Sequence, residues 1–339
     1  MAIWRRDEQQ QLTPDLFEAI RKLAPPPHIQ LYQLAGLDKL KRQAHLAKDR
    51  DEIASTAKLI TGLTERGFMR KLKTVSSTYK SDLLNLAERF PNFSEVINYV
   101  HRCAEIAWRT DKVLRLTPIL LSGDAGVGKT VFSEALGAWM DHGFHRISIS
   151  SSQNGSELSG SSTFWSNSKP GIPFTALTES DYANPLIFID EIDKNSTSQY
   201  DALGALYVLL EPTTAKNYAD QSVPLPLDCS HINWIACCNY LDLVPAPIKS
   251  RFKCFNITIT EAQTRKIAQA IVRAKLAELM PATDGMTVSE AAMNALATMS
   301  PRKIGHAITD AIGDSLIKNT TLIEVVEAET PKRRMGFLP

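Results

Sequence analysis

The sequence predicts an α/β fold in which a parallel sheet lies between layers of helices, with a helical region before it and a small helical lid after it. Short apolar runs alternate with longer segments of helical periodicity, and several runs are apolar throughout, as in strands that are covered on both faces. A glycine-rich run at residues 123–130 stands directly between one such strand and a helix. Together these two observations favour a doubly covered parallel sheet with a ligand site at its edge.

The composition agrees with a folded, multidomain protein. The 339 residues are 44% hydrophobic and carry a net charge of +1, which excludes disordered and collagen-like chains and predicts about two domains. The five cysteines show no metal-ligand spacing, so we expect reduced thiols in a cytoplasmic protein. Because no apolar run approaches the ~18 residues of a membrane span, no membrane partner is expected.

Charge divides the chain. Residues 1–84 hold 15 basic and 10 acidic residues, a net charge of +5, whereas the remainder has a net charge of −4. The stretches around 37–60 and 63–73 are predicted to be helical. Their basic residues form either a solvated helix face, which we favour because acidic residues are interspersed, or contacts to phosphate or an acidic partner. These residues are Lys39, Lys41, Arg42, Arg66, Arg70, Lys71 and Lys73.

The elements that follow are predicted from apolar spacing. Ser94 to Arg109 has helical spacing, and strands are expected at 118–121, 147–149, 186–189, 232–238 and 255–259. Thr260-x-x-Gln263 and Thr287-x-x-Glu290 look like capping boxes that begin helices. The expected domains are a basic helical region (1–84) that could bind a partner, an α/β core (85–258), a helical lid (259–325) and a tail (326–339).

The run at 123–130 fits the phosphate-binding pattern G-x-x-x-x-G-K-[ST]. It consists of Gly123, Asp124, Ala125, Gly126, Val127, Gly128, Lys129 and Thr130. The glycines let successive backbone N–H groups surround phosphate oxygens, and the following helix N-terminus adds positive charge. Lys129 is expected to reach the β- and γ-phosphates, and the Thr130 hydroxyl to bind Mg²⁺.

An acidic pair, Asp190-Glu191, ends the strand expected at 186–189. Ligands gather at the carboxyl ends of parallel strands, so both carboxylates are expected near the phosphates. Asp190 suits Mg²⁺, partly through bound water, and Glu191 suits the base that activates the attacking water. The two motifs together predict a Mg²⁺-dependent nucleoside triphosphate hydrolase.

These motifs resemble those of the AAA+ ATPases, and more narrowly the ATPase module of the Lon family. The similarity covers about residues 90–320 and is carried by Asp190-Glu-Ile-Asp-Lys194 and by the segments 209–212, 217–220, 226–228, 235–242 and 245–252. The resemblance implies a P-loop NTPase fold of the AAA+ type, ATP and Mg²⁺ as cofactors, and a homo-oligomeric ring with six subunits as the expected size.

The resemblance also implies roles for three more residues. Asn239 corresponds to sensor 1, which helps to place the attacking water, and Arg251 to the arginine finger that enters a neighbouring subunit's site. Arg302 stands at the place of sensor 2, although the family's usual Gly-x-Arg is Ser300-Pro-Arg302 here. The alternatives are a turn-forming Asn239, a solvated Arg251 and an ordinary Arg302 at the start of a helix.

The segment 161–171 resembles the Lon pore loop, whose aromatic residue grips a translocating polypeptide. Phe164 and Trp165 would have this role here. Large rings on an exposed loop usually bind something, but the two rings could instead pack back onto the core.

The resemblance has limits that shape the expected function. Too few residues follow the lid for the Lon peptidase domain, and residues 1–84 do not resemble the Lon N-terminal domain, so we expect an ATP hydrolase that is not a peptidase by itself. We expect this ATPase to remodel or thread a macromolecule, chiefly a protein. One alternative is a nucleic-acid-associated AAA+ ATPase that uses residues 1–84, and another is an ATP-driven switch or scaffold for an effector system.

Overall fold

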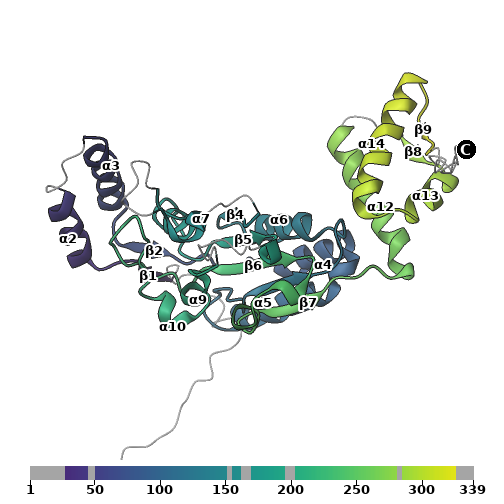
Figure 1. Cartoon of the computed structure of the whole chain (residues 1–339). Helices are drawn as coiled ribbons and strands as arrows, with labels where there is room; N and C mark the ends of the chain where they lie inside the picture. The colour runs from purple at the N-terminus through teal and green to yellow at the C-terminus, as the bar shows by residue number, and fades with distance from the viewer. Residues whose placement is uncertain are drawn as a thin grey trace, which may run out of the picture.

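The computed structural model describes residues 27–44, 50–150, 155–161, 169–194, 203–280 and 285–325. Figure 1 shows three successive parts: a core sheet with its covering helices, two helices and a small sheet at one end, and a helical lid at the other. We call these parts the core, the N-terminal part and the lid.

The core contains a five-stranded sheet in the order β4-β5-β6-β3-β7, and every neighbouring pair of strands is parallel. The strands are β3 (Ile119–Ser122), β4 (Phe144–Ser148), β5 (Leu186–Asp190), β6 (Asn233–Cys238) and β7 (Lys253–Asn256). Strands β3, β5 and β6 are buried along their whole length, as expected for the inner strands of a parallel sheet. The predicted α/β fold with a parallel sheet is therefore confirmed.

Alternate side chains of the sheet enter two different apolar clusters. In β3, Ile119 and Leu121 pack with helices α4 (Tyr79–Arg89), α5 (Ser94–Arg109) and α6 (Lys129–Met140). Leu120 belongs instead to a cluster that includes the N-terminal part and helices α8 (Ile172–Thr178) and α9 (Leu206–Leu209). The sheet is thus the middle layer of three.

Two strands differ from their predicted ranges. Strand β4 starts at Phe144, before the apolar run at 147–149, and it includes the polar residues His145 and Arg146. Strand β7 ends at Asn256 rather than at 259. Both strands lie at an edge of the sheet, where one side of the strand has no neighbour and a continuous apolar run is not required.

The N-terminal part is not wholly helical. Helices α2 (Leu34–Ala44) and α3 (Arg50–Arg66) are accompanied by β1 (His28–Gln30), which pairs antiparallel with β2 (Met69–Lys71). The prediction of a helix over 63–73 is therefore wrong beyond residue 66. Gly67 follows α3 with a φ of +70°, a conformation that glycine adopts readily and that cannot continue a right-handed helix.

Three of the basic residues in this part make contacts within the chain. Arg66 pairs with Asp181, and Lys73 pairs with Asp141. Arg70 is only 3% exposed, and its guanidinium donates to the carbonyl oxygens of Arg66, Gly67, Met69, Leu177 and Thr178. Arg70 is therefore removed from the set of cations that could contact a partner; it joins β2 to α8.

The lid has an apolar cluster of its own. It consists of α12 (Glu261–Leu279), α13 (Glu290–Ala297) and α14 (Pro301–Ile317), with β8 (Thr287–Val288) pairing with β9 (Leu322–Ile323). Buried residues such as Val272, Leu296 and Ile308 form this third cluster. Helix α12 is the longest described helix, and no described helix is both long and apolar enough to cross a membrane.

Of the two predicted capping boxes, one is confirmed. At the start of α12, the side-chain oxygen of Gln263 accepts the backbone N–H of Thr260 at 3.0 Å. The box at Thr287 is wrong because Thr287 lies in β8. Helix α13 begins three residues later, where the Ser289 side chain accepts the N–H of Ala292 at 3.1 Å.

Six short helical elements complete the description. They are η1 (Pro91–Phe93), α7 (Ser156–Ser159), η2 (Ile192–Lys194), α10 (Pro212–Ala215), η3 (Leu241–Leu243) and α11 (Ala246–Lys249). The first of these contacts the lid, because the Gln263 side chain donates to the Pro91 carbonyl at 3.1 Å. The lid therefore meets the core at the end of α4, close to the phosphate-binding run.

Candidate active site

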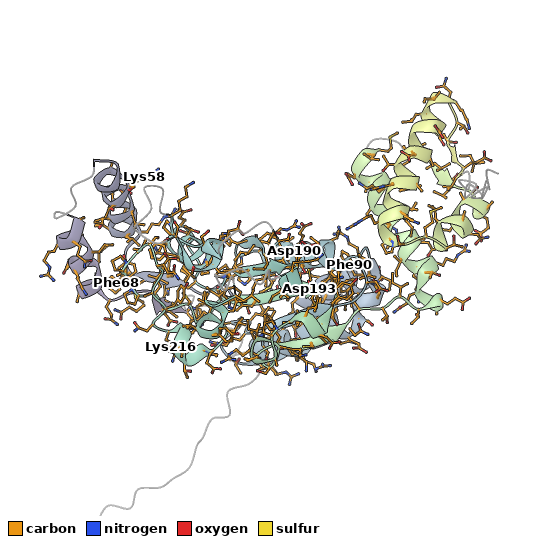
Figure 2. All side chains as sticks on the ribbon, in the orientation of Figure 1. Lys58, Phe68, Phe90, Asp190, Asp193 and Lys216 are labelled. Atoms are coloured by element: carbon orange, nitrogen blue, oxygen red, sulfur yellow. The ribbon has the colours of Figure 1, made fainter. Side chains whose placement is uncertain are left out.

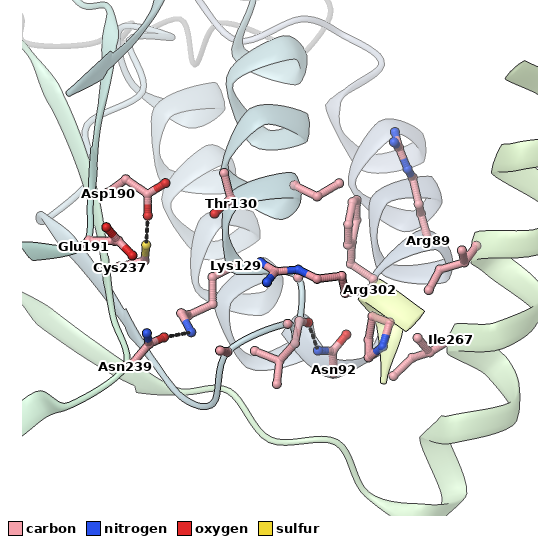
Figure 3. Close-up of a pocket in the computed structure, with 18 of the residues that line it drawn as sticks. Arg89, Asn92, Lys129, Thr130, Asp190, Glu191, Cys237, Asn239, Ile267 and Arg302 are labelled. Carbon is pink, nitrogen blue, oxygen red and sulfur yellow. Dashed lines mark hydrogen bonds between the residues drawn. The ribbon is translucent and has the colours of Figure 1, made fainter. Parts of the chain in front are cut away.

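A cavity of about 860 Å³ lies between the carboxyl end of the sheet and the lid (Figure 3). Its walls come from the loop before α6, the ends of β4, β5 and β6, the segment around η1, and the lid helices α12 and α14. Most of the predicted site residues line it: Ala125, Gly126, Val127, Gly128, Lys129, Thr130, Asp190, Glu191, Asn239 and Arg302. Gly123, Asp124 and Arg251 do not.

The phosphate-binding run depends on the backbone freedom of glycine. Gly123, Gly126 and Gly128 have φ values of +148°, +87° and +100°, which residues with a side chain rarely adopt. A Cβ atom on Gly123 would also lie 2.3 Å from the carbonyl oxygen of Ile257. The close approach of the chain after β7 therefore requires glycine at this position, and helix α6 begins directly after the run at Lys129.

Lys129 links the run to the end of β6. Its side chain is buried, and its ammonium donates to the carbonyl oxygens of Gly123 (2.6 Å) and Asp124 (3.0 Å) and to Asn239 Oδ1 (3.0 Å). These three bonds match the three donors of an ammonium group. Lys129 and Asn239 were predicted separately, and the structure brings them into direct contact.

Asp190 ends β5 with both carboxylate oxygens engaged. Oδ2 pairs with the Arg146 guanidinium at 2.5 Å, and Oδ1 accepts from the Cys237 thiol at 2.8 Å. Burial, with a further contribution from the bond to Asp190, raises the pKa of the Cys237 thiol. The thiol therefore stays protonated and acts as a hydrogen-bond donor, which fixes the orientation of the carboxylate.

The donor set at this edge fits Mg²⁺. The Thr130 hydroxyl and the Asp190 carboxylate line the same cavity and are the hard oxygen ligands that this ion prefers. Asp190 already holds a cationic group, the Arg146 guanidinium. The described residues contain no group of three or more His, Cys, Asp or Glu side chains arranged for a metal, so water and phosphate oxygens would complete the coordination, as is usual for Mg²⁺.

Glu191 lies in the left-handed region of the backbone, with a φ of +54°. For a residue with a side chain this conformation costs about 1–3 kcal/mol and is found mainly at functional sites. Two residues later, Asp193 accepts the backbone N–H groups of Asn239 (3.0 Å) and Tyr240 (2.9 Å) through Oδ2. Asp193 thereby ties the acidic segment to the loop that carries Asn239.

The two predicted arginines lie in different places. Arg302, at the start of α14, lines the cavity, and in Figure 3 its side chain extends from the lid toward the phosphate-binding run. Arg251 does not line this cavity; its Nη1 donates to the Pro247 carbonyl at 2.6 Å, and its guanidinium lies 5.9 Å from the centroid of the Tyr207 ring.

Several lining residues escaped the sequence analysis. Asn92 donates to the Val127 carbonyl at 3.1 Å and so supports the phosphate-binding run, while Arg146 contacts Asp190. Other unpredicted lining residues come from the end of α4, from the residue that follows it and from α12: Arg89, Phe90, Ile267, Ile271, Lys275 and Glu278. No local pattern marks them; only Asp193 had a signal, because it belongs to the acidic run that begins at Asp190.

The segment compared with a pore loop is only partly described, and Phe164 and Trp165 lie outside the described residues. Its described ends meet, because Lys169 N–H donates to Ser161 Oγ at 2.6 Å. Nearby, the buried Asp220 accepts the N–H of Gly171 at 2.8 Å.

These features define a P-loop fold with a candidate phosphate-binding site. Residues 119–260 match the model of the family described as "ATPase family associated with various cellular activities (AAA)". This match confirms the predicted fold type for this part of the chain.

The chain is also similar in sequence to Lon proteases. It is 32% identical to Lon protease 1 of Syntrophotalea carbinolica over 136 residues, which cover 40% of this chain and 17% of that protein. It is 27% identical to the Lon protease of Mycoplasma genitalium over 252 residues, 74% of this chain and 31% of that protein. The chain thus aligns with less than a third of the length of these relatives.

A solved structure supports the fold alone. The chain resembles a structure of Hsp104 with ATPγS and FITC-casein with a TM-score of 0.54 at 16% identity, covering 81% of this chain and 54% of that one. Because the sequence identity is low, this similarity concerns the arrangement of the elements.

Proposed function

We propose that this chain is a Mg²⁺-dependent ATPase that works in an oligomeric ring and remodels or threads a protein. The main support for this proposal is that one cavity is lined by all five of the expected residues, Lys129, Thr130, Asp190, Glu191 and Asn239 (Figure 3). These residue types are the ones that phosphoryl transfer to water requires: a phosphate cradle, oxygen ligands for Mg²⁺, a base and a polar group that orients water.

Nucleotide binding begins with a change of partners at Lys129. Its three present bonds go to two carbonyl oxygens and to Asn239, and phosphate oxygens would replace some of them with charge-assisted bonds, which are stronger. Asn239 Oδ1 is then free to accept a hydrogen bond from water. Phosphate binding at Lys129 would therefore release Asn239 to orient the attacking water.

Thr130 and Asp190 would hold Mg²⁺. When bound, the ion would neutralise charge on the oxygens of the transferred phosphoryl group. Glu191 would accept a proton from the attacking water, and its unusual backbone conformation sets the direction in which its carboxylate leaves the strand. Arg302 would add a positive charge from the lid, so that the lid responds to the nucleotide.

Arg251 would act on a neighbouring subunit's nucleotide. Its position outside the cavity of its own chain and its bond to the Pro247 carbonyl support this proposal. A planar, permanently charged guanidinium is suited to neutralise the transition state. We therefore expect a ring in which each subunit completes the next subunit's site, with six subunits as the expected size.

A protein is the proposed substrate. The similarity to Lon proteases and the fold similarity to Hsp104, whose solved structure contains FITC-casein, support this choice. The test adds FITC-casein and measures ATPase activity. Threading predicts that casein stimulates the activity and that replacing both Phe164 and Trp165 by Ala removes this stimulation but leaves the basal turnover. A pure switch should scarcely respond to the replacement.

The direct test of the proposed function is the Glu191→Gln variant. The variant should bind ATP as the wild type does but hydrolyse it about 100-fold or more slowly, because it keeps the ground-state contacts and loses the base. Nucleotide binding is measured by equilibrium dialysis and turnover by phosphate release. A variant that hydrolyses ATP at the wild-type rate would contradict the assignment of Glu191. Pull-down with this variant under ATP would then identify the physiological substrate.

A nucleic-acid-associated ATPase is the second candidate. The exposed cations Lys39, Arg42 and Lys71 in the N-terminal part favour it, whereas the buried Arg70 and the paired Arg66 and Lys73 weaken it. If this candidate is correct, DNA or RNA should stimulate hydrolysis, and its binding should weaken steeply with salt.

A further inference from the structure

Arg146 holds a position at the candidate metal site that the phosphate-binding motifs do not require. It lies on the edge strand β4, next to β5, and its Nη2 is 2.5 Å from Asp190 Oδ2. The guanidinium also lies over the Phe188 ring, 5.8 Å from its centroid. Arg146 lines the same cavity as Thr130 and Glu191.

A second carboxylate lies on the other side of this guanidinium. Nη1 of Arg146 is 3.7 Å from Oε1 of Glu134, which belongs to α6. Glu134 is 48% exposed, whereas the Asp190 side chain is only 9% exposed. Arg146 therefore lies between a buried carboxylate, to which it is tightly bound, and a solvated one, which it barely reaches.

We propose that Arg146 is the resident counter-ion of Asp190 in the nucleotide-free protein and that it competes with Mg²⁺ for this carboxylate, with Glu134 receiving the guanidinium when Mg²⁺ and nucleotide enter. This inference rests on the proposed function, since it concerns the same Mg²⁺·nucleotide site. Arg146 is a positioning residue: it acts through Asp190 and sets the Mg²⁺ concentration at which nucleotide binds.

The geometry explains why the two cations exclude each other. The Cys237 thiol already donates to Asp190 Oδ1, and Arg146 and Mg²⁺ on the same carboxylate would share its single negative charge and repel each other. A buried carboxylate without a cation is costly, which is why Arg146 stabilises the empty site. Because Glu134 is already within 3.7 Å, Arg146 can leave Asp190 without losing all ionic contact.

The test measures binding of a fluorescent ATP analogue by anisotropy while the free Mg²⁺ concentration is raised from micromolar to millimolar. Arg146→Gln should lower the Mg²⁺ midpoint about twofold to fivefold, the range for loss of a partly exposed ion pair. Glu134→Gln should move the midpoint in the opposite direction, because the displaced guanidinium loses its second partner. Arg146→Lys, which keeps the charge but not the planar fork, should lie between the wild type and Arg146→Gln.

The double variant tests whether Glu134 acts through Arg146 or only through its own charge near the site. If Glu134 acts through Arg146, then Glu134→Gln should have no effect on the midpoint once Arg146 is Gln, so the two changes are not additive. Arg115→Gln is the matched control, because it removes another Arg–Asp pair, with Asp111 at 2.6 Å, from a site outside the cavity. This control should leave the midpoint unchanged.

The outcomes distinguish the inference from the function on which it rests. A wild-type protein that binds no nucleotide at any Mg²⁺ concentration would overturn both, whereas nucleotide binding that does not depend on Mg²⁺ would overturn the inference alone. Normal Mg²⁺ dependence in the wild type, with an unchanged or higher midpoint in both Arg146 variants, would overturn the role of Arg146 and leave the ATPase proposal intact. Additive effects of the Arg146 and Glu134 changes would overturn the transfer to Glu134.

Discussion

At the scale of single residues, the candidate site is built from side chains that satisfy one another before any ligand enters. Lys129 uses its three donors on backbone and Asn239, Asp190 is held by a thiol and a guanidinium, and Asp193 holds the loop after β6. Binding therefore exchanges existing hydrogen bonds for new ones, and each exchange can be tested by removing one partner.

Lys129→Ala should weaken ATP binding by at least about 100-fold, because a buried ammonium that meets phosphate is lost and neutral contacts cannot replace it. Equilibrium dialysis with labelled ATP measures this change. Lys216→Ala, which alters an exposed lysine outside the cavity, is the control. An affinity that is unchanged in Lys129→Ala would refute the phosphate cradle.

His142 gives a residue-scale prediction about pH. It is buried at 4% exposure, and its Nδ1 has no hydrogen-bond partner among the described residues. Burial, reinforced by Lys73 and opposed by Asp141, lowers its pKa from 6.5 to about 4. Between these values the unfolded chain binds a proton that the folded protein does not, so the free energy of unfolding should fall as pH drops from 6.5 to 4.

The loss of unfolding free energy that is due to His142 should reach about 3 kcal/mol near pH 4. Urea denaturation at a series of pH values checks this, with His142→Gln as the comparison. Because burial also lowers the pKa values of His145 and His231, the variant should flatten the acid side of the profile without removing all of its slope. Identical pH profiles for the variant and the wild type would contradict the prediction.

The sequence predicts the contiguous part of the site but not its surroundings. Residues 123–130 and Asp190-Glu191 follow fixed spacing rules, because one loop or one strand end carries them. Arg146, Asn92 and Ile267 come from β4, η1 and α12, and only the fold brings these elements together. No spacing within the chain encodes such a meeting.

At the scale of elements, the sequence predicts two short strands wrongly, because their polar residues fit a helix pattern equally well. Strand β2 contains a buried arginine where helical charge spacing was expected, and β8 takes the threonine that looked like a helix cap. The inner strands, in contrast, were predicted within a residue or two, because burial on both faces requires an apolar run.

Arg70→Met should destabilise the N-terminal part. The change leaves several carbonyl oxygens of residues 66–69 and 177–178 without their donor, and we expect a loss of about 3 kcal/mol. Urea denaturation and hydrogen exchange over α3 and β2 measure it. Arg66→Met, which removes an exposed pair with Asp181, should cost less than about 1 kcal/mol; equal losses would show that Arg70 is not a structural anchor.

At the scale of the whole molecule, the core and the lid have separate apolar clusters but share one cavity, whereas the N-terminal part packs into one of the core clusters. The lid has its own apolar cluster, and the core has two clusters, one on each face of the sheet. Figure 2 shows Phe90, Asp190 and Asp193 on the side of the core nearest the lid, whereas Lys58 and Phe68 lie at the opposite end. In the proposed ring each site would depend on a second subunit, because Arg251 does not line the cavity of its own chain.

Arg251→Ala should abolish turnover, yet mixing it with Glu191→Gln should restore part of the activity. In mixed rings, a site with an intact Glu191 can receive Arg251 from the neighbouring subunit. Phosphate release measured over a range of mixing ratios checks this. The control mixes Arg251→Ala with the Glu191→Gln/Arg251→Ala double variant and should show no recovery; absence of recovery in the first mixture as well would contradict action across an interface.

The length of α12 has a mechanical consequence. The helix begins next to the Thr260–Gln263 box, where the Gln263 side chain holds the Pro91 carbonyl, and it continues for 19 residues to Leu279. At 1.5 Å per residue it is a rod of about 28 Å, so a swing of about 10° about its first turn carries its tip through about 5 Å. A small change of angle at the first turn of α12 would therefore displace the far end of the lid by several ångströms.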